Sequence, residues 1–326
     1  MNTFILIDVH NLFHRAKFTT HGDISLKTGM AVNTMFNSLR KIWKMFEGTH
    51  IVLCTDHKSW RYAYYPEYKR ARHIKRDNLS QKDQDEEQLL KEALDSFLDF
   101  CEKRTNATVI KQKGLEADDI ISKWIEKHPN DYHIILSGDT DFIQLLSDNV
   151  IMYDGARERT IKIDGYYDKN DQLMYKSVGK NKKQVAQIPK EPEYELFLKC
   201  IRGDSSDGIF SSYPGVRETK IQKAYKDRHT QLEDWNNFML HEWYDSNDKK
   251  HRVLDDYNFN KLLIDLKNQP DDIQQLLNET IESLLHKKNN KNVGVWFLTF
   301  CEEWDLQRHK NNPETIARIL QTNYPN

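Results

Sequence analysis

The chain has 326 residues, of which 38% are hydrophobic, 11% aromatic and 30% charged, and its formal net charge is −2. This length predicts more than one domain, and the aromatic content argues against a disordered chain. No run reaches the roughly 18 apolar residues that span a bilayer, and the four cysteines lack the spacing of a zinc site.

Short apolar runs alternate with helical patterns along the first half of the chain. The apolar runs predict buried strands, at residues 3–9, 50–55, 108–110, 132–136 and 150–153. Apolar residues at helical spacing predict helices, at residues 29–46, 84–104 and 117–127, with a helical turn at 142–146. This alternation is typical of a parallel sheet with crossover helices, so we predict an α/β fold.

The pattern changes after residue 154. Residues 155–190 are rich in Gly, Lys, Asn and Asp, which predicts turns and exposed loops. Helical patterns predominate from there on, at residues 193–201, 219–225, 233–244, 257–267, 271–287, 294–304 and 313–321. We therefore predict two domains, an α/β core over 1–190 and an all-helical C-terminal region over 191–326.

Carboxylates stand where predicted strands and helices begin or end. They are Asp8, Asp56, Glu116, Asp118, Asp119, Asp139, Asp141, Asp204 and Asp207. Because open α/β sheets bind ligands beyond the carboxyl ends of their strands, the acids that follow strands are expected at one rim. Mg²⁺ and Mn²⁺ prefer oxygen ligands, and two such ions about 3.5–4 Å apart can act on both oxygens of a phosphodiester displacement.

An alternative explanation for each acid is helix capping. Asp and Glu satisfy free backbone N–H groups at helix starts and interact favourably with the helix dipole. Capping accounts for any one of these acids. It does not predict the paired acids Asp139 and Asp141, or Asp204 and Asp207, so we favour metal binding for the set.

A basic and aromatic stretch follows Asp56. Between His57 and Arg76 basic residues alternate with Trp and Tyr, and Glu67 is the one acid. Basic groups neutralise phosphates, and aromatic faces stack on bases irrespective of sequence. The stretch therefore predicts contact with a nucleic acid beside the acidic rim.

These motifs together resemble those of the phage and bacterial 5′-nuclease family. The family includes flap endonucleases, the 5′-nuclease domains of bacterial DNA polymerase I and the T-even-phage ribonuclease H, the branch nearest in likeness. The matching segments are Asp8, Thr55-Asp56, 66–72 (PEYKRAR), 116–119 (EADD), 138–142 (GDTDF) and 203–208 (GDSSDG). The resemblance covers residues 1 to about 225, in the order of the family.

The resemblance implies a PIN-like core with two metal ions. One ion would be held by Asp8, Asp56, Glu116, Asp118 and Asp139. The other would be held by Asp139, Asp141, Asp204 and Asp207, partly through water. Asp119 matches an additional acid of some members, and Asp139 is the predicted catalytic acid because it bridges both ions. Mg²⁺ is the expected metal, with Mn²⁺ as a substitute.

The resemblance also implies two nucleic-acid contacts. An arch over about 57–85 would place Lys69 and Arg72 on the scissile phosphate as catalytic groups. Tyr68 would stack on a base, and Arg70 is a further expected nucleic-acid contact. A helix–three-turn–helix over about 193–226 would bind duplex phosphates, with a K⁺ ion. There the family's Gly-x-Gly-x-Lys ending is replaced by 215–220 (GVRETK), so Arg217 and Lys220 are expected to supply the charge.

The implied activity is 5′→3′ hydrolysis at the 5′ ends of RNA–DNA hybrids and of nicked or flapped duplex DNA, removing RNA primers and flaps during replication. A monomer in the cytoplasm (that of the host, for a phage protein) is expected, with no membrane partner. A single-strand-binding protein or a sliding clamp is the expected protein partner. Two alternatives stay open, a toxin-like ribonuclease of the PIN class and a non-catalytic DNA-binding member.

Overall fold

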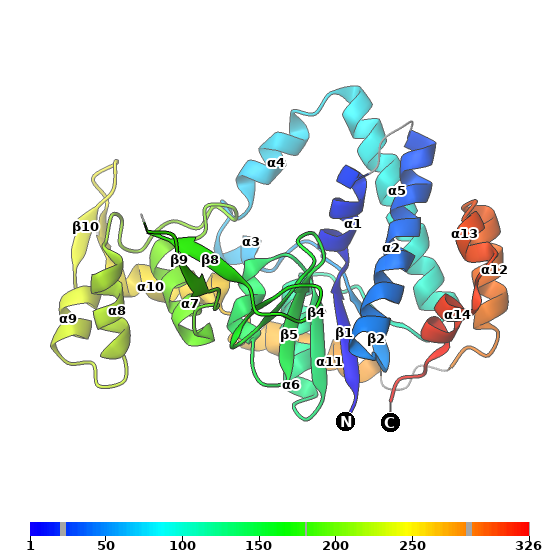
Figure 1. The fold of residues 1–326 in the computed structure, drawn as a ribbon. Helices are drawn as coiled ribbons and strands as arrows, with labels where there is room; N and C mark the ends of the chain where they lie inside the picture. The colour runs from blue at the N-terminus through cyan, green and yellow to red at the C-terminus, as the bar shows by residue number, and fades with distance from the viewer. Residues whose placement is uncertain (20–23, 180, 285–288, 326) are drawn as a thin grey trace. The chain divides into compact units, whose positions relative to one another are not determined.

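The structure, a computed structural model, describes residues 1–19, 24–179, 181–284 and 289–325, and it divides the chain into two compact units. The first unit comprises Met1–Ser59, Leu79–Pro189 and Gln275–Asn326. The second comprises Trp60–Asn78 and Lys190–Gln274. Figure 1 shows the elements of both.

A seven-stranded sheet forms the centre of the first unit, in the order β3-β2-β1-β4-β5-β6-β7. The strands are β1 Thr3–Asp8, β2 His50–Cys54, β3 Thr108–Ile110, β4 Tyr132–Leu136, β5 Val150–Asp154, β6 Arg159–Lys162 and β7 Gly165–Tyr167. The first five strands are parallel, whereas β6 and β7 are antiparallel. In the register, Asp8 pairs with Cys54 and Ile7 pairs with Leu136, so the carboxyl ends of β1, β2 and β4 are level.

Helices of the same unit pack on this sheet and on one another. They are α1 Val9–Thr19, α2 Ile24–Phe46, α5 Gln81–Arg104, α6 Ala117–Lys127, α12 Val293–Glu303, α13 Gln307–Lys310 and α14 Glu314–Gln321, with a 3-10 helix at Thr140–Leu145. Helices α2 and α5 lie side by side, as Figure 1 shows. Phe36 of α2 meets both Phe97 of α5 and Phe297 of α12 edge to face. All three side chains are fully buried in one hydrophobic cluster. The C-terminal helices therefore complete the core of the α/β unit.

The second unit has a core of its own, built around Phe197, Ile201 and Ile221. Its helices are α3 Arg61–Tyr64, α4 Arg70–Asp77, α7 Pro192–Arg202, α8 Glu218–Lys226, α9 Glu233–Met239 and α10 Val253–Ile264, and α11 Asp271–Leu284 spans the boundary between the units. The buried side chain of Asn260 donates to the carbonyl oxygens of Cys200 and Phe210, which joins α10 to α7 and to the turn after it.

The expected α/β class and mostly parallel sheet are confirmed, and β4 and α6 have the bounds predicted from the sequence. The interval predicted to be turns and loops instead contains β6, β7 and a hairpin of β8 Tyr175–Val178 and β9 Lys183–Ala186. The region expected to be all-helical contains a second hairpin, β10 Glu242–Tyr244 and β11 Lys250–Arg252, so the helix predicted over 233–244 ends early. Residues 285–287 of the predicted 271–287 helix lie outside the described residues.

The two units do not follow a single break in the chain. A division near residue 190 is present, but residues 60–78 belong with the later segment and residues 275–326 belong with the α/β core. A long-range hydrogen bond explains why residues 60–78 belong to the second unit, because buried Arg61 donates to the carbonyl of Leu263 at 2.7 Å. Within the described residues, no helix has the length and apolar character needed to cross a membrane.

Candidate functional site

Asp8 is the centre of the acidic edge, the name we use for Asp8, Asp56, Glu116, Asp118, Asp119, Asp139 and Asp141. It ends β1 and is almost completely buried. The N–H of Asn11 donates to its Oδ1 at 3.1 Å, and the Ser137 hydroxyl donates to its Oδ2 at 3.0 Å. These bonds fix the carboxylate between the ends of β1 and β4.

Neighbouring acids act on Asp8 electrostatically. Burial, together with the charges of Asp56 and Asp139, raises the pKa of Asp8 to about 7. Burial also raises the pKa of the Cys54 thiol, and the charges of Asp8, Asp56 and Asp118 add to that shift. These acids therefore lie within electrostatic reach of one another at the carboxyl ends of β1, β2 and β4.

Asp56 connects β2 to the start of α6. Its Oδ1 accepts the N–H of Ala117, the first residue of that helix, at 2.9 Å. Its Oδ2 is 3.6 Å from Nδ1 of His10. The side chain is 42% exposed, so Asp56 keeps open access to solvent while it fixes α6.

Glu116 and Asp119 cap α6. The Asp119 side chain accepts the backbone N–H of Glu116 at 3.1 Å, and the two residues form a reciprocal capping box. The hydroxyl of Ser59 donates to Oε2 of Glu116 at 2.7 Å. Both acids are buried, whereas Asp118 between them is half-buried. The capping alternative therefore fits Asp119 best, and Asp118 is the acid of this group with more access to the edge.

Asp139 and Asp141 form a small local structure after β4. Oδ1 of Asp139 accepts the N–H of Asp141 at 3.0 Å and so caps the 3-10 helix, while the N–H of Asp139 donates to Ser137 Oγ. Ser137 thus contacts both Asp8 and Asp139. Both acids of the pair are half-buried.

The chemistry of this edge fits a hydrated hard cation. Among the described residues, no three carboxylate, imidazole or thiol side chains are grouped closely enough to enclose a metal ion. Mg²⁺ keeps several waters and needs only one or two direct carboxylates, unlike a structural zinc ion. Burial raises the pKa of Asp8, and the charges of Asp56 and Asp139 raise it further, so a cation beside these carboxylates would favour their ionised forms.

In the second unit, Asp207 holds the segment 60–78 in place. Its carboxylate accepts hydrogen bonds from Arg72 at 2.6 Å and from the Tyr68 hydroxyl at 3.0 Å, and Lys69 Nζ is 3.8 Å away. The backbone N–H of Lys69 also donates to the Asp207 carbonyl. Burial raises the pKa of Asp207, and the charges of Lys69 and Arg72 act in the opposite direction.

Two residues predicted to contact nucleic acid, Tyr68 and Arg70, are instead engaged in contacts within the protein. Tyr68 is 3% exposed and packs against Tyr62, so its ring is not presented for stacking on a base. Arg70 forms an exposed ion pair with Glu67 at 2.6 Å. Helix α4 as a whole contains no buried residue, and its basic side chains form an exposed positive surface.

The turn after α7 is organised by Asp204. Its Oδ1 accepts the N–H groups of Ser206 and Asp207, and Lys199 Nζ is 3.6 Å from its Oδ2. Burial would raise the pKa of Asp204, but the bonds from Ser206 and the charge of Lys199 outweigh it and the pKa is lowered. Arg217, at the start of α8, and Lys220 are both exposed. The predicted K⁺ site here stays a prediction.

Comparison with known proteins decides the family. Residues 3–175 match the family described as 5′-3′ exonuclease, N-terminal resolvase-like domain. The chain belongs to this 5′-3′ exonuclease family. The resemblance inferred from the sequence motifs is thereby confirmed.

Among curated relatives of this exonuclease-family chain, the flap endonuclease Xni of Psychromonas ingrahamii is 29% identical over 162 residues, which are 47% of this chain and 57% of the relative. The 5′-3′ exonuclease of Bacillus subtilis is 27% identical over 239 residues, 69% of each chain. The chain therefore matches 57% of the length of that Xni protein, and 60% of the Xni of Pseudoalteromonas translucida.

Solved structures of the bacteriophage T5 D15 protein have the same fold as this exonuclease-family chain. One, co-crystallised with metal ions, superposes with a TM-score of 0.62 at 19% identity and covers 87% of this chain and 98% of D15. Another, described as a D15 flap endonuclease complex with DNA and metal ions, gives a TM-score of 0.63 at 18% identity with the same coverage.

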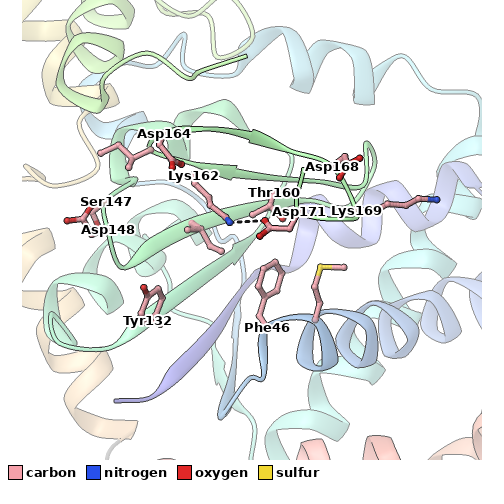
Figure 2. Close-up of a pocket in the computed structure, with 13 residues that line it drawn as sticks. Phe46, Tyr132, Ser147, Asp148, Thr160, Lys162, Asp164, Asp168, Lys169 and Asp171 are labelled. Carbon is pink, nitrogen blue, oxygen red and sulfur yellow. Dashed lines mark hydrogen bonds and ion pairs between the residues drawn. The ribbon is translucent and has the colours of Figure 1, made fainter. Parts of the chain in front are cut away.

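A pocket of about 500 Å³ lies elsewhere in the first unit of this family member. Figure 2 shows its lining, with Lys162 bonded to Asp171 at 2.8 Å. Tyr132 begins β4 and Asp148 precedes β5, so the pocket is at the opposite ends of these strands from the acidic edge. Since no predicted site residue lines it, we assign it no part in the site.

One charged group beside the acidic edge was missed by the sequence reasoning. Asp154 ends β5 and is bonded to Arg157 and Arg159. It directly follows the strand predicted at 150–153, which is the same signal that identified Asp8. Asp154 could therefore have been found from the sequence, whereas its arginine partners follow no recognised motif.

Proposed function

We propose that this chain is a divalent-metal-dependent nuclease that hydrolyses phosphodiester bonds at the 5′ ends of nucleic acids. The observation that carries the proposal is the acidic edge, in which Asp8 is almost buried between strand ends with a pKa raised to about 7. Membership of the 5′-3′ exonuclease family and the names of the Xni and Bacillus subtilis relatives support the same activity.

In the first unit, we assign the holding of a cation to Asp8, Asp56, Asp118 and Asp139. Glu116 and Asp119 orient α6 through their capping box, and Asp141 follows the cap made by Asp139. When bound, divalent cations supply an activated water and neutralise charge on the phosphate. The bacteriophage T5 D15 protein, which has the same fold, was co-crystallised with metal ions, and this supports such a cofactor. Mg²⁺ as the metal, and a second ion involving Asp204 and Asp207, are parts of the proposal that rest on the sequence.

The basic groups of the second unit are proposed to bind phosphate. Lys69 and Arg72 would stabilise charge on the scissile phosphate, and the exposed α4, Arg217 and Lys220 would contact the backbone. Because Arg72 is bonded to Asp207, its action on phosphate requires that bond to open or to be shared.

The proposed substrates are nicked or flapped duplex DNA and RNA–DNA hybrids, cut in the 5′→3′ direction. Removal of primers and flaps during replication is the corresponding role, which the DNA polymerase I relatives support. A monomer that meets a single-strand-binding protein or a sliding clamp completes the proposal.

The test is cleavage of a 5′-labelled flap duplex and of an RNA–DNA hybrid, each with Mg²⁺, Mn²⁺ or EDTA. We expect metal-dependent release of short 5′ products from both substrates. Asp139→Asn should abolish cleavage with DNA binding largely retained, whereas Asp148→Asn, an exposed acid at the other end of the sheet, should leave cleavage unchanged.

Three other outcomes would count against the proposal. Binding without cleavage in either metal would favour a non-catalytic DNA-binding protein. Cleavage confined to unstructured RNA would favour a toxin-like ribonuclease. Equal loss of cleavage and binding in Asp139→Asn would contradict the role given to that residue.

A further inference from the structure

Asp154 lies at the centre of a charged group at the carboxyl end of β5. Its side chain is 1% exposed. Oδ1 accepts the N–H groups of Ala156 and Arg157 at 3.1 and 3.2 Å, and Oδ2 accepts from Arg157 Nη1 at 2.9 Å and Arg159 Nε at 3.2 Å. Burial would raise the pKa of Asp154, but these partners lower it. The carboxylate is therefore ionised and fully bonded by its own loop.

Arg15 of α1 joins the same group. A Cβ atom on Gly155 would lie 2.5 Å from Nη1 and 3.0 Å from Nη2 of Arg15, so the guanidinium packs directly over the backbone of that glycine. Burial lowers the pKa of Arg15, and the charge of Asp154 acts to raise it. We name Arg15, Arg157 and Arg159 the arginine cluster.

The arginine cluster keeps a net positive charge. Three guanidinium groups gather around one carboxylate, Asp154. The other acid of the loop, Glu158, forms an ion pair with Lys41 of α2 and so does not offset the arginines. Arg157 is 63% exposed and Arg159 is 19% exposed, with Arg159 lying over the ring of Tyr166 at 4.8 Å.

This positive group stands beside the acidic edge. Strands β4 and β5 are parallel neighbours, with Leu136 paired to Tyr153. The position of a Cβ on Gly138 is 3.5 Å from Oδ1 of Asp154, and Gly138 directly precedes Asp139. The arginine cluster and the proposed metal-binding acids are thus separated by a single turn of chain.

We infer that the arginine cluster binds a phosphate of the nucleic-acid strand close to the bond that is cut. The inference rests on the proposed function. An acidic edge repels a polyanionic strand, and positive groups next to it offset that repulsion. The planar guanidinium group donates to phosphate oxygens in a bidentate manner, and in a partly desolvated position such bonds are strong.

A purely structural role for the cluster accounts for less of the geometry. Neutralising one buried carboxylate requires one cation, and two backbone N–H groups already bond to Asp154. Arg157 donates a hydrogen bond to Asp154 through Nη1, while 63% of its side chain remains exposed to solvent. The additional positive charge is explained by an anionic ligand.

The test is DNA binding by the full chain, measured by fluorescence anisotropy with a 5′-flap duplex in EDTA over a series of KCl concentrations. Arg157→Gln should weaken binding about tenfold and reduce the slope of log K against log salt by about one, as expected for one lost phosphate contact. Arg157→Lys should restore the slope, because the charge is retained. The control is Arg318→Gln, an exposed arginine on α14, which should behave as the wild type.

The inference is overturned if Arg157→Gln matches Arg318→Gln in both affinity and salt slope. Thermal melting of both variants verifies that the fold is retained, and Arg159→Gln gives a second variant of the same cluster. Cleavage of the flap by the wild type is measured in parallel. If the wild type cleaves the flap and Arg157→Gln binds DNA as the wild type does, the phosphate-binding role of the arginine cluster is refuted and the proposed function is not. Absence of wild-type cleavage refutes the proposed function, whereas a slope that depends on Arg157 still supports a phosphate site.

Discussion

Arg72 donates a 2.6 Å hydrogen bond to Asp207, although the two residues are 135 positions apart in the chain. One was predicted from the sequence as a phosphate-binding group and the other as a metal ligand. In the second unit each is the partner of the other, and the pair connects α4 to the turn after α7. The arginine and the acid are therefore coupled, and a change at one is expected to affect the function of the other.

Asp207→Asn tests this coupling. Loss of the charge removes an ionic partner from Arg72 and Lys69 and should destabilise the second unit by about 1–2 kcal/mol. Hydrogen exchange of the amides of 69–77 measures the effect, and exchange there should accelerate. In Arg70→Gln, which loses only an exposed pair with Glu67, the same amides should change little. Unchanged exchange in Asp207→Asn would refute the anchoring role.

Lys69→Ala tests the assignment of Lys69 to the chemical step. If its ammonium group stabilises charge on the scissile phosphate, the single-turnover cleavage rate should fall about a hundredfold. Binding of the flap substrate should weaken only a few-fold, since many other contacts remain. Lys75→Ala on the exposed part of α4 is the matched control and should affect binding more than rate. Equal effects of Lys69→Ala on rate and binding would contradict a catalytic role.

Two glycines give opposite predictions for stability. Gly203 has φ +71°, and a Cβ there would lie 2.4 Å from the carbonyl oxygens of Ile209 and Phe210. Gly203→Ala should therefore destabilise the turn that carries Asp204 and Asp207, by about 2–4 kcal/mol. Gly29 lies inside α2 with its nearest neighbour at 3.7 Å, so Gly29→Ala should stabilise by about 0.5–1 kcal/mol. Urea unfolding measures the change in the free energy of unfolding of each variant. A change of the same sign in both variants would contradict this account.

Stability should also depend on His133, which is buried in β4 and donates through Nε2 to the carbonyl of His128. Burial lowers the pKa of His133 from 6.5 to about 4. Between these two values the unfolded chain binds the proton more readily than the folded chain. The contribution of His133 to the free energy of unfolding is therefore fully present above pH 6.5. The free energy of unfolding should fall by about 3 kcal/mol as the pH decreases to 4.

Urea unfolding at pH 7.5, 6 and 5 measures this dependence. His133→Gln should flatten the change within that window, whereas substitution of exposed His229 by Gln should leave it as in the wild type. An equally steep loss of stability in His133→Gln would show that other groups are responsible.

Elements with strong local patterns were predictable from the sequence. The continuous apolar runs of β1, β2 and β4 gave their positions, and the acids after them fall together because parallel strands end at one edge. The hairpin strands β8 and β9 were missed because nearly all their residues are exposed, which leaves no apolar run to detect.

The roles of single acids were less predictable. The bond from Ser59 to Glu116 and the capping box with Asp119 depend on where α6 begins in three dimensions. Likewise, the partnership of Asp207 with Tyr68 and Arg72 joins segments that are remote in the chain, and no local pattern contains it. Residue type identified the chemistry, and long-range pairing decided which acids are already bonded.

The burial of Phe297 and Phe300 against Phe36 has a consequence for synthesis of the protein. A ribosome produces β1 and α2 first, yet the apolar surface of α2 stays without its final cover until α12 and α14 have emerged. The α/β unit therefore cannot fold to completion until the segment that carries α12 and α14 has been synthesised. The acidic edge would therefore take its final form only after the segment that carries α12 and α14 has packed against α2, although the strands that carry the acids are made much earlier.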